Sequence, residues 1–506
     1  MYHTSRPVIT GRKGVISSGH YLATIAGTKM LAKGGNAIDG KATIKWFKDN
    51  GIRLIPGDGY LGATVPGLFG AYATALMRFG RLSLADIMAP AIEIAEYGFP
   101  TYKWLSDSLK KHENDYLAKW SSTADVFKPG GCVHSVGQLI KQPALARTMR
   151  KIVEAEIRLS GQGRDRAIRN AMDFFYQGEI ADKMLEYSKN NPVRDVSGKS
   201  HTALLEKEDF LAHETRIEEP VCADYKEYRV YKCGPWTQGP VFLQQLKLLE
   251  CSKLAFADRN KYYGDPLFSD VPLERLFSGD YNQDKRKLVN LDRANNSELD
   301  EPEELADIKT YTGDTTHLDV IDDEGFMMSA TPSGGWIPTS PLIPELGFPL
   351  GTRAQCFNLN EGHPNSLQPG KRPRITLTPS LAFKGGKPWI VFGTSGGDHQ
   401  DQWLLQFFLN LVEFDMDLQE AIDKPAFHTR HFRNTFYPKD INPCTLFLEK
   451  EIKLEDMMKL QDMGHKLNIL HCNDSQVNAV RINHETGCIE GAASYKYDGQ
   501  SYAYGW

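Results

Sequence analysis

A threonine in mid-sequence has the clearest chemical option in this chain. Thr315 ends a polar stretch and opens a pattern typical of a β-hairpin, in which apolar runs at 318–321 and 326–331 flank the acidic turn 322–325. If the bond between Asp314 and Thr315 were broken, Thr315 would gain a free α-amine, which could act as the base for its own hydroxyl. The residue equally suits an ordinary strand start, because β-branched side chains favour strands. The local sequence leaves both interpretations open.

A double glycine is the second chemical feature. Gly396 and Gly397 lie between an apolar strand pattern at 388–392 and an apolar helix pattern at 402–414. Glycines let the backbone approach a ligand closely, and the first N–H groups of a helix have no partner within the helix. The pair is therefore a candidate donor site for the oxyanion of an acyl-transfer reaction, although a plain tight turn accounts for the same residues.

The same turn supports a rival interpretation. Its five residues, 393–397, match the G-x-S-x-G nucleophile elbow of serine hydrolases, and they lie between a strand and a helix as that motif requires. Ser395 would then be the nucleophile, with Asp and His residues available downstream. The motif is short, and the chain contains 44 glycines, so a chance match is also open.

The elements that must position these residues change in character along the chain. Helix patterns cover 21–33, 65–79, 84–97 and 241–263, whereas strands and tight turns dominate after Thr315. The polar, acidic stretch at about 292–314 is typical of a solvated linker. A strand-rich centre with helices on both sides predicts a layered α+β sandwich.

Composition and charge are ordinary for a globular protein. The chain has 506 residues, 41% of them hydrophobic, and a net charge of −5 from 59 basic and 64 acidic residues. This balance does not point to nucleic acid or a membrane as partner. No apolar run approaches the length needed to span a bilayer, and the first seven residues contain no signal-peptide pattern. We therefore expect a cytoplasmic protein.

Metal ligands do not follow the spacing of known sites. None of the eight cysteines forms a C-x-x-C pair, and the 14 histidines contain no H-E-x-x-H pattern. His428 and His431 are three residues apart, which is a weak pair. We expect no metal and no organic cofactor.

Several stretches together resemble the gamma-glutamyltransferase (glutathione hydrolase) family of N-terminal nucleophile hydrolases. The matches follow the family order over nearly the whole chain, which is more specific than any single motif. They are Ser17-Ser18-Gly19-His20, Gly34-Gly35-Asn36-Ala37-Ile38-Asp39, Val65-Pro66-Gly67, Ala255-Phe256-Ala257-Asp258-Arg259, Thr315-Thr316-His317, Pro369-Gly370-Lys371-Arg372-Pro373, Gly393-Thr394-Ser395-Gly396-Gly397 and Met416-Asp417-Leu418-Gln419-Glu420-Ala421.

The resemblance implies a four-layer αββα sandwich made as a self-cleaving precursor, or zymogen, of glutathione metabolism. The cut would fall between Asp314 and Thr315, and residues 1–314 and 315–506 would stay together as one interlocked catalytic domain. Thr315 would form the acyl-enzyme and Ser333 would assist it. Gly396 and Gly397 would hold the oxyanion, and Ser395 would be a turn residue.

The substrate pocket departs from the family pattern. Two adjacent serines of the γ-glutamyl pocket become Ile375 and Thr376, a substrate-binding asparagine becomes Gly335, and the residues that hold the glutamyl amine have no clear match around 352–355. These changes resemble a divergent branch that contains glutathione hydrolase-like proteins and oxamate amidohydrolase. Candidates for a re-specified pocket are Trp336, Arg353, Arg372, Arg374 and Asp398.

Each of these candidates could equally be structural. Asp398 replaces a small polar residue, and a buried carboxylate there would repel an anionic substrate unless it were paired. Arg372 suits a structural ion pair better than a substrate contact.

Two sections that family members contain are missing. One is absent after Gly40, where the family has core strands and an arginine that grips the glutamyl carboxylate; the other is absent between Glu250 and Cys251. Losing a central strand would expose apolar faces and unpaired backbone groups. The chain could therefore be a catalytically inactive relative or a defective product.

The resemblance predicts an N-terminal threonine amidohydrolase or acyltransferase. It would cleave a small amide, γ-glutamyl or oxamate-like, through an acyl-enzyme on Thr315 after autocleavage. Its partners would be that small molecule and the two fragments of its own precursor. The identity of the acyl donor, the choice of water or an amine as acceptor and the oligomeric state stay open.

Overall fold

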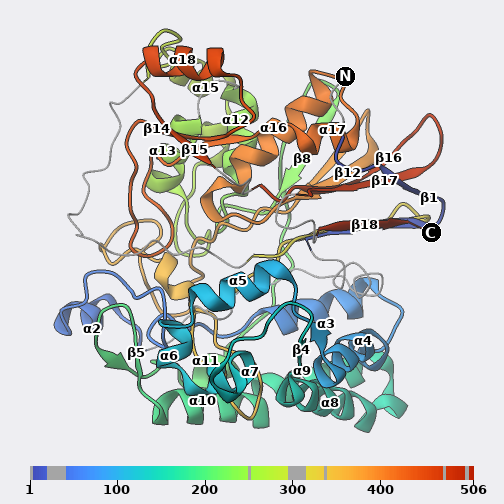
Figure 1. The fold of residues 1–506 in the computed structure, drawn as a ribbon, viewed down its shortest axis with the longest axis vertical. Helices are drawn as coiled ribbons and strands as arrows, with labels where there is room; N and C mark the ends of the chain where they lie inside the picture. Colours follow the sequence, from blue (N-terminus) through green and yellow to red (C-terminus); the bar gives the residue numbers. More distant parts are fainter. Residues whose placement is uncertain are drawn as a thin grey trace.

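Two antiparallel β-sheets stack on each other and carry the ends of the described chain (Figure 1). The computed structural model describes residues 4–19, 41–248, 252–294, 315–334, 339–470, 475–495 and 501–505. The larger sheet has the strand order β1 (Ile9–Gly11), β17 (Ile489–Ala493), β16 (Asn478–Ile482), β12 (Lys387–Gly393), β11 (Ser380–Lys384), β8 (Tyr228–Lys232) and β7 (Val221–Tyr225). The smaller has the order β10 (Met327–Ala330), β9 (Leu318–Asp322), β2 (Gly14–Ser18) and β18 (Tyr502–Gly505).

An apolar layer joins the two sheets. In β9 alternate residues point to opposite faces, so Asp319 and Ile321 are buried while their neighbours are half-buried. The register pairs Val15 of β2 with Ile321 of β9. Both pack against the larger sheet, together with Val391, Val480 and Ile489. β9, which follows Thr315 in the chain, is thereby packed against the larger sheet.

Helices cover the outer face of the larger sheet. The helices are α12 (Gly239–Leu248), α16 (Gln400–Val412) and α17 (Leu418–Asp423) (Figure 1). Phe242, Trp403 and Phe408 bury their rings against Phe392 and its neighbours on β12. The buried strand at 388–392 and the helix that follows the double glycine were both predicted, and the structure confirms them as β12 and α16.

A second apolar core belongs to a helical region in the lower half of the molecule (Figure 1). Its main helices are α3 (Leu68–Phe79), α4 (Leu84–Tyr97), α8 (Pro143–Arg158), α9 (Arg164–Tyr176) and α10 (Glu179–Asn190). Helix α4 begins with a capping box from Ser83 and ends at Gly98, whose φ of +92° suits glycine. The predicted bounds 84–97 are confirmed because these end signals are local.

The remaining elements are short. The helices are α2 (Ile44–Asp49), α5 (Lys103–Lys111), α6 (Tyr116–Lys119), α7 (Ser121–Phe127), α11 (Lys207–Leu211), α13 (Ser252–Tyr262), α14 (Leu273–Phe277), α15 (Gly279–Arg286), α18 (Leu454–Asp462) and the 3₁₀ turns η1 (Pro129–Gly131), η2 (Ser160–Gln162), η3 (Arg353–Cys356) and η4 (Gly397–His399). The strands are β3 (Phe99–Pro100), β4 (Leu139–Ile140), β5 (Val193–Arg194), β6 (Ser200–His201), β13 (Phe427–Thr429), β14 (Thr445–Glu449) and β15 (Lys466–Leu470).

The chain is an α+β protein with a two-sheet centre. The helix predicted at 21–33 lies outside the described residues, and the pattern at 241–263 forms α12 and α13 on either side of the undescribed residues 249–251. Within the described ranges, every helix is too short or too polar to cross a bilayer.

Candidate active site

The open end of the β9–β10 hairpin brings Thr315 and Ser333 together. The two residues form an isolated antiparallel bridge beyond the last paired residues of the hairpin. The Thr316 N–H donates to the Pro332 carbonyl at 3.1 Å, and the Thr315 Oγ1 and Ser333 Oγ hydroxyls share a hydrogen bond of 3.0 Å. Two hydroxyls that are 18 residues apart in sequence are therefore adjacent because a hairpin folds back on itself.

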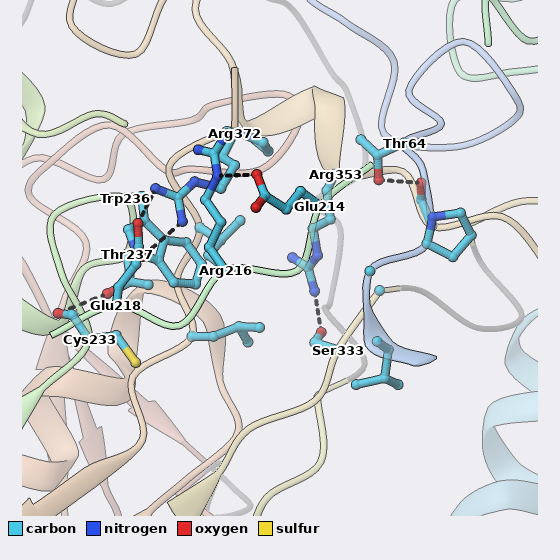
Figure 2. Close-up of a pocket in the computed structure, with 18 of the residues that line it drawn as sticks. Thr64, Glu214, Arg216, Glu218, Cys233, Trp236, Thr237, Ser333, Arg353 and Arg372 are labelled. Carbon is cyan, nitrogen blue, oxygen red and sulfur yellow. Dashed lines mark hydrogen bonds and ion pairs between the residues drawn. The ribbon is translucent and has the colours of Figure 1, made fainter. Parts of the chain in front are cut away.

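Arg353 adds a cation to this pair. Its guanidinium donates to Ser333 Oγ (Figure 2) and lies 5.3 Å from the centre of the Phe436 ring. Arg353 as a whole is only 5% exposed. Hydrogen bonds from segment 57–64 hold the arginine in place. The Ala354 N–H donates to the Gly62 carbonyl at 3.1 Å, and the Thr64 N–H donates to the Gly351 carbonyl at 3.0 Å.

Ser333 and Arg353 lie on the wall of a cavity of about 950 Å³. Figure 2 shows the two residues on one side of it, with Trp236 and Arg372 on another. Much of the remaining wall is apolar. It includes Leu68, Leu267, Phe268, Ile375, Leu377, Pro66, Pro220, Pro332, Pro349, Pro369, Pro373 and Pro379. The cavity is large enough for a drug-sized ligand.

A buried histidine lies two residues after Thr315. His317 Nε2 is 2.8 Å from the Asp319 carboxylate and Nδ1 is 2.8 Å from Thr331 Oγ1, and both His317 and Asp319 are fully buried. Burial raises the pKa of Asp319 above its usual range. The imidazole packs on Gly393 so closely that a Cβ there would lie 2.1 Å from the ring. No site role was predicted from the sequence for His317, Asp319 or Thr331, whose one signal was the Thr-Thr-His run.

The turn at 394–397 has the backbone that the oxyanion hypothesis needs. Gly396 and Gly397 have φ values of +118° and +57°, which favour glycine, and the turn leads into η4 and α16. Among the described residues, neither amide N–H has a protein acceptor. Gln476 connects the turn to the start of the hairpin. It accepts a hydrogen bond from Ser395 Oγ at 2.7 Å, and both Gln476 and Thr316 lie within 4 Å of the point where a Cβ on Gly19 would stand.

Ser395 lacks the surroundings of an elbow nucleophile. Its hydroxyl donates to Gln476, and its φ is not in the left-handed region. The nearby His399 accepts a hydrogen bond at Nε2 from Arg430 at 3.1 Å, and burial lowers the His399 pKa well below its usual range. No histidine hydrogen-bonds Ser395 in the described parts of the chain. Within the described residues, Ser395 therefore has the contacts of a turn residue and lacks a hydrogen-bonded base.

The prediction that Asp398 belongs to the substrate pocket does not match its surroundings. Asp398 is 4% exposed, forms an ion pair with Arg259, accepts from the Thr435 N–H at 2.7 Å and from Thr435 Oγ1 at 2.6 Å, and is absent from the cavity wall. Its charge is therefore used inside the protein. Gln238 links this cluster to the turn, since its Nε2 donates to the Gly397 carbonyl at 3.1 Å.

The other pocket candidates are dispersed. Arg372 lines the cavity but is paired with Asp265 and Glu218, as its structural alternative predicted. Arg374 is buried away from the cavity wall, and burial lowers its pKa to about 9. Thr376 is also buried, and its hydroxyl has no partner among the described residues. The other predicted site residues, Asp314, Gly335 and Trp336, lie outside the described residues.

The arrangement of the possible metal ligands does not form a metal site. In the ranges that the structure describes, no three His, Cys, Asp or Glu side chains gather as metal ligands would. The weak pair His428 and His431 does not act as a ligand set, because His431 Nδ1 accepts from the Cys444 N–H at 2.8 Å.

Sequence comparisons place the chain among known enzymes. The model of the gamma-glutamyltranspeptidase family matches residues 40–504. The glutathione hydrolase-like YwrD proenzyme of Bacillus subtilis is 28% identical over 97% of this chain and 98% of its own length. The glutathione hydrolase proenzyme of the same species is 27% identical over 98% of this chain and 92% of its own length. That alignment runs over 592 positions, more than the 506 residues of this chain, so the relative has residues opposite internal gaps.

Two solved structures match the fold of this chain over its full length. The structure of LmbA2991HD is 33% identical, with a TM-score of 0.91 over all of both chains. A cephalosporin acylase from Bacillus halodurans is 24% identical, with a TM-score of 0.82 over all of this chain and 98% of its own, which shows the shared fold. The internal gaps therefore leave the chain with the overall arrangement of these relatives.

Proposed function

Since the chain belongs to the gamma-glutamyltranspeptidase family, we propose that it is the precursor of an N-terminal threonine amidohydrolase with Thr315 as nucleophile. One observation carries the proposal. The Thr315 hydroxyl is 3.0 Å from the Ser333 hydroxyl, which also accepts from the buried Arg353 on the wall of the large cavity. A nucleophile, an orienting hydroxyl and a cation thus meet where a substrate could enter.

Maturation would use the same hydroxyl. Thr315 Oγ attacks the carbonyl carbon of Asp314, and breaking the Asp314–Thr315 C–N bond leaves an ester on Oγ and a free amine on Thr315. Water then hydrolyses the ester, which frees the Thr315 hydroxyl and leaves a carboxylate on Asp314. The resulting segments 1–314 and 315–506 would stay associated, because β8 pairs with β11 and β2 pairs with β9.

Turnover follows the same logic. The free amine of Thr315 accepts the hydroxyl proton as Oγ attacks the amide carbonyl, and the N–H groups of Gly396 and Gly397 stabilise the oxyanion. The amine product leaves with that proton and an ester remains on Thr315. Water, or a second amine, then attacks the ester and releases the acyl group. Ser333 is the residue that orients Oγ throughout.

The substrate would be a small amide of the γ-glutamyl or oxamate-like type. Relatives named glutathione hydrolase and acylase support an amide bond as the target. We further propose the four-layer αββα arrangement of N-terminal nucleophile hydrolases, supported by the two stacked sheets and their helical cover. Arg353 is the pocket residue that the geometry favours for substrate contact; Thr376 would contribute only if its buried hydroxyl were reached.

Intact mass under denaturing conditions tests the proposal. We expect two fragments from the wild type, with the smaller beginning at Thr315, and a single uncut chain from Thr315→Ala. Ser395→Ala is the matched control and should still be cut. A wild type that stays uncut and turns over no chromogenic γ-glutamyl or simple amide substrate would favour the inactive or defective product. Cleavage and turnover that need Ser395 and not Thr315 would favour the serine hydrolase.

A further inference from the structure

Resting on the proposed function, we propose that Gln238 is a positioning residue for the oxyanion donors. Its side-chain amide donates from Nε2 to the Gly397 carbonyl at 3.1 Å, and Gln238 is fully buried. Gln238 does not touch the reacting atoms. It acts through the turn, by fixing the direction in which the N–H groups of Gly396 and Gly397 point.

The double glycine needs an anchor because glycine alone does not fix a peptide plane. Without a Cβ, Gly396 and Gly397 reach many backbone conformations, and the peptide between them can rotate at little steric cost. The carbonyl and the N–H of one planar peptide point in opposite directions, so holding the carbonyl also directs the N–H. The His399 N–H donates to the Gly396 carbonyl at 3.1 Å and thereby directs the Gly397 N–H. Gln238 holds the next carbonyl, so the peptides on both sides of Gly397 are anchored.

Arg259 determines which end of the Gln238 amide faces the turn. Its guanidinium donates to Gln238 Oε1 at 3.2 Å, and a guanidinium has donors only. The amide oxygen must therefore face Arg259, which leaves the N–H end for the Gly397 carbonyl. Arg259 is fully buried and is fixed in turn by Asp398 and by the Arg433 carbonyl at 3.1 Å. A hydrogen bond from a cation also polarises the amide and strengthens its donor end.

The anchored turn lies close to the hydroxyl pair. A Cβ on Gly397 would lie 3.2 Å from the Phe436 ring. The Arg353 guanidinium lies 5.3 Å from the centre of the same ring and donates to Ser333 Oγ. Ser333 in turn shares its hydrogen bond with Thr315. A continuous set of contacts therefore runs from the Gly397 backbone to the candidate nucleophile.

The anchor and the turn lie on opposite sides of the proposed cut. Gln238 belongs to segment 1–314, whereas the turn that it holds belongs to segment 315–506. Gln238 is itself fixed just before α12, where the Gly239 N–H donates to Thr237 Oγ1 at 3.0 Å. After cleavage the direction of the oxyanion donors would therefore depend on both fragments, and a separated small fragment would lose the anchor.

Substitutions at Gln238 should slow the chemical steps rather than weaken substrate binding. Acylation and deacylation both pass through an oxyanion, so a misdirected donor slows both steps and leaves KM almost unchanged. Gln238→Met keeps the volume and lacks the donor, and we expect its kcat to fall at least about tenfold while KM changes less than about twofold. Gln238→Glu keeps the shape and the contact with Arg259, which favours the ionised carboxylate. An ionised carboxylate only accepts hydrogen bonds, so the same loss of kcat is expected at pH 8.

The matched control is Gln245→Met on α12, which should keep the kcat of the wild type. Gln245 is 1% exposed, and neither polar atom of its side chain has a hydrogen-bond partner within the described residues. The assay follows the release of 4-nitroaniline from γ-glutamyl-4-nitroanilide by the purified full chain at pH 8. Intact mass gives the cut fraction, so kcat is expressed per cut chain. Wild-type kcat in either Gln238 variant, a loss confined to KM, or an equal loss in Gln245→Met would overturn the inference.

Hydrogen–deuterium exchange keeps this inference distinct from the proposed function, because it needs no cleavage and no turnover. The His399 N–H, which donates to the Gly396 carbonyl, reports on the turn. In Gln238→Met we expect peptides that cover 394–400 to exchange at least about tenfold faster than in the wild type and in Gln245→Met. Faster exchange with no turnover by the wild type supports the anchor, and the proposed function then fails alone. Unchanged exchange refutes the anchor, and turnover by the wild type then leaves the proposed function standing.

Discussion

Replacing Gly393 by alanine should break the contact that fixes the segment after Thr315. Gly393 ends β12 with a backbone that any residue can adopt, so the effect of a methyl group there is steric. That methyl would lie 2.1 Å from the nearest His317 ring atom, whereas carbon contacts need about 3.5 Å, so the ring must move by roughly 1.4 Å. Such a shift stretches the 2.8 Å bonds to Asp319 and Thr331 beyond hydrogen-bond range.

The expected cost of Gly393→Ala follows from these contacts. Leaving two buried polar groups unsatisfied costs about 1–3 kcal/mol each, and overpacking adds about 1–3 kcal/mol, so a total of roughly 3–9 kcal/mol is expected. Thermal unfolding followed by circular dichroism should show a midpoint lowered by several degrees. Denaturing mass should show slower cleavage at Thr315.

The matched control for this substitution is Gly279→Ala. Gly279 is the first residue of α15, and an added Cβ there meets nothing within 4 Å. Its unfolding midpoint should stay near that of the wild type. If Gly393→Ala unfolds within about 2 °C of Gly279→Ala, the ring is free to move and the steric reasoning is wrong.

Two further predictions concern buried charge. Asp398→Ala leaves Arg259 without its carboxylate and should lower the free energy of unfolding by about 3–5 kcal/mol, measured as the urea midpoint; a midpoint equal to the wild type would contradict this. Burial lowers the pKa of His213 to about 4, below the 6.5 of an ordinary histidine. The unfolded chain therefore binds a proton at His213 more readily than the folded chain, and the free energy of unfolding falls as the pH is lowered from 6.5 to 4. His213→Phe keeps the ring stack on Tyr176. Between pH 7.5 and 4.5 its free energy of unfolding should fall by roughly 2–3 kcal/mol less than that of the wild type. An equal fall in the two proteins would refute this.

Local signals made part of the fold predictable. Ser83 and Gly98 bound α4 because capping depends on neighbouring residues, and the apolar run at 388–392 forms β12 because its side chains are buried on both faces. The glycines at 396 and 397 were predicted to form a turn, and their positive φ values show one. Their role as oxyanion donors stays a prediction.

Long-range contacts were not predictable in the same way. Asp398 was expected in the pocket, but Arg259, 139 residues away, binds it instead. The sequence shows that Asp398 and Arg259 are ionisable, but it does not show that they are close in space. The partner was therefore decided by the packing of α13 against the segment after α16, through the stacked rings of Phe256 and Phe432.

The sequence by itself determined the family, the α+β class and the identity of the candidate nucleophile, because these depend on residue type and on order along the chain. Only the tertiary structure decided the contacts that surround this nucleophile. The hairpin places Ser333 against Thr315, the hydrogen bonds of segment 57–64 hold Arg353 against Ser333, and the space that Gly393 leaves is filled by His317. Each contact depends on how two distant segments pack, and burial then determines which charge remains for a substrate.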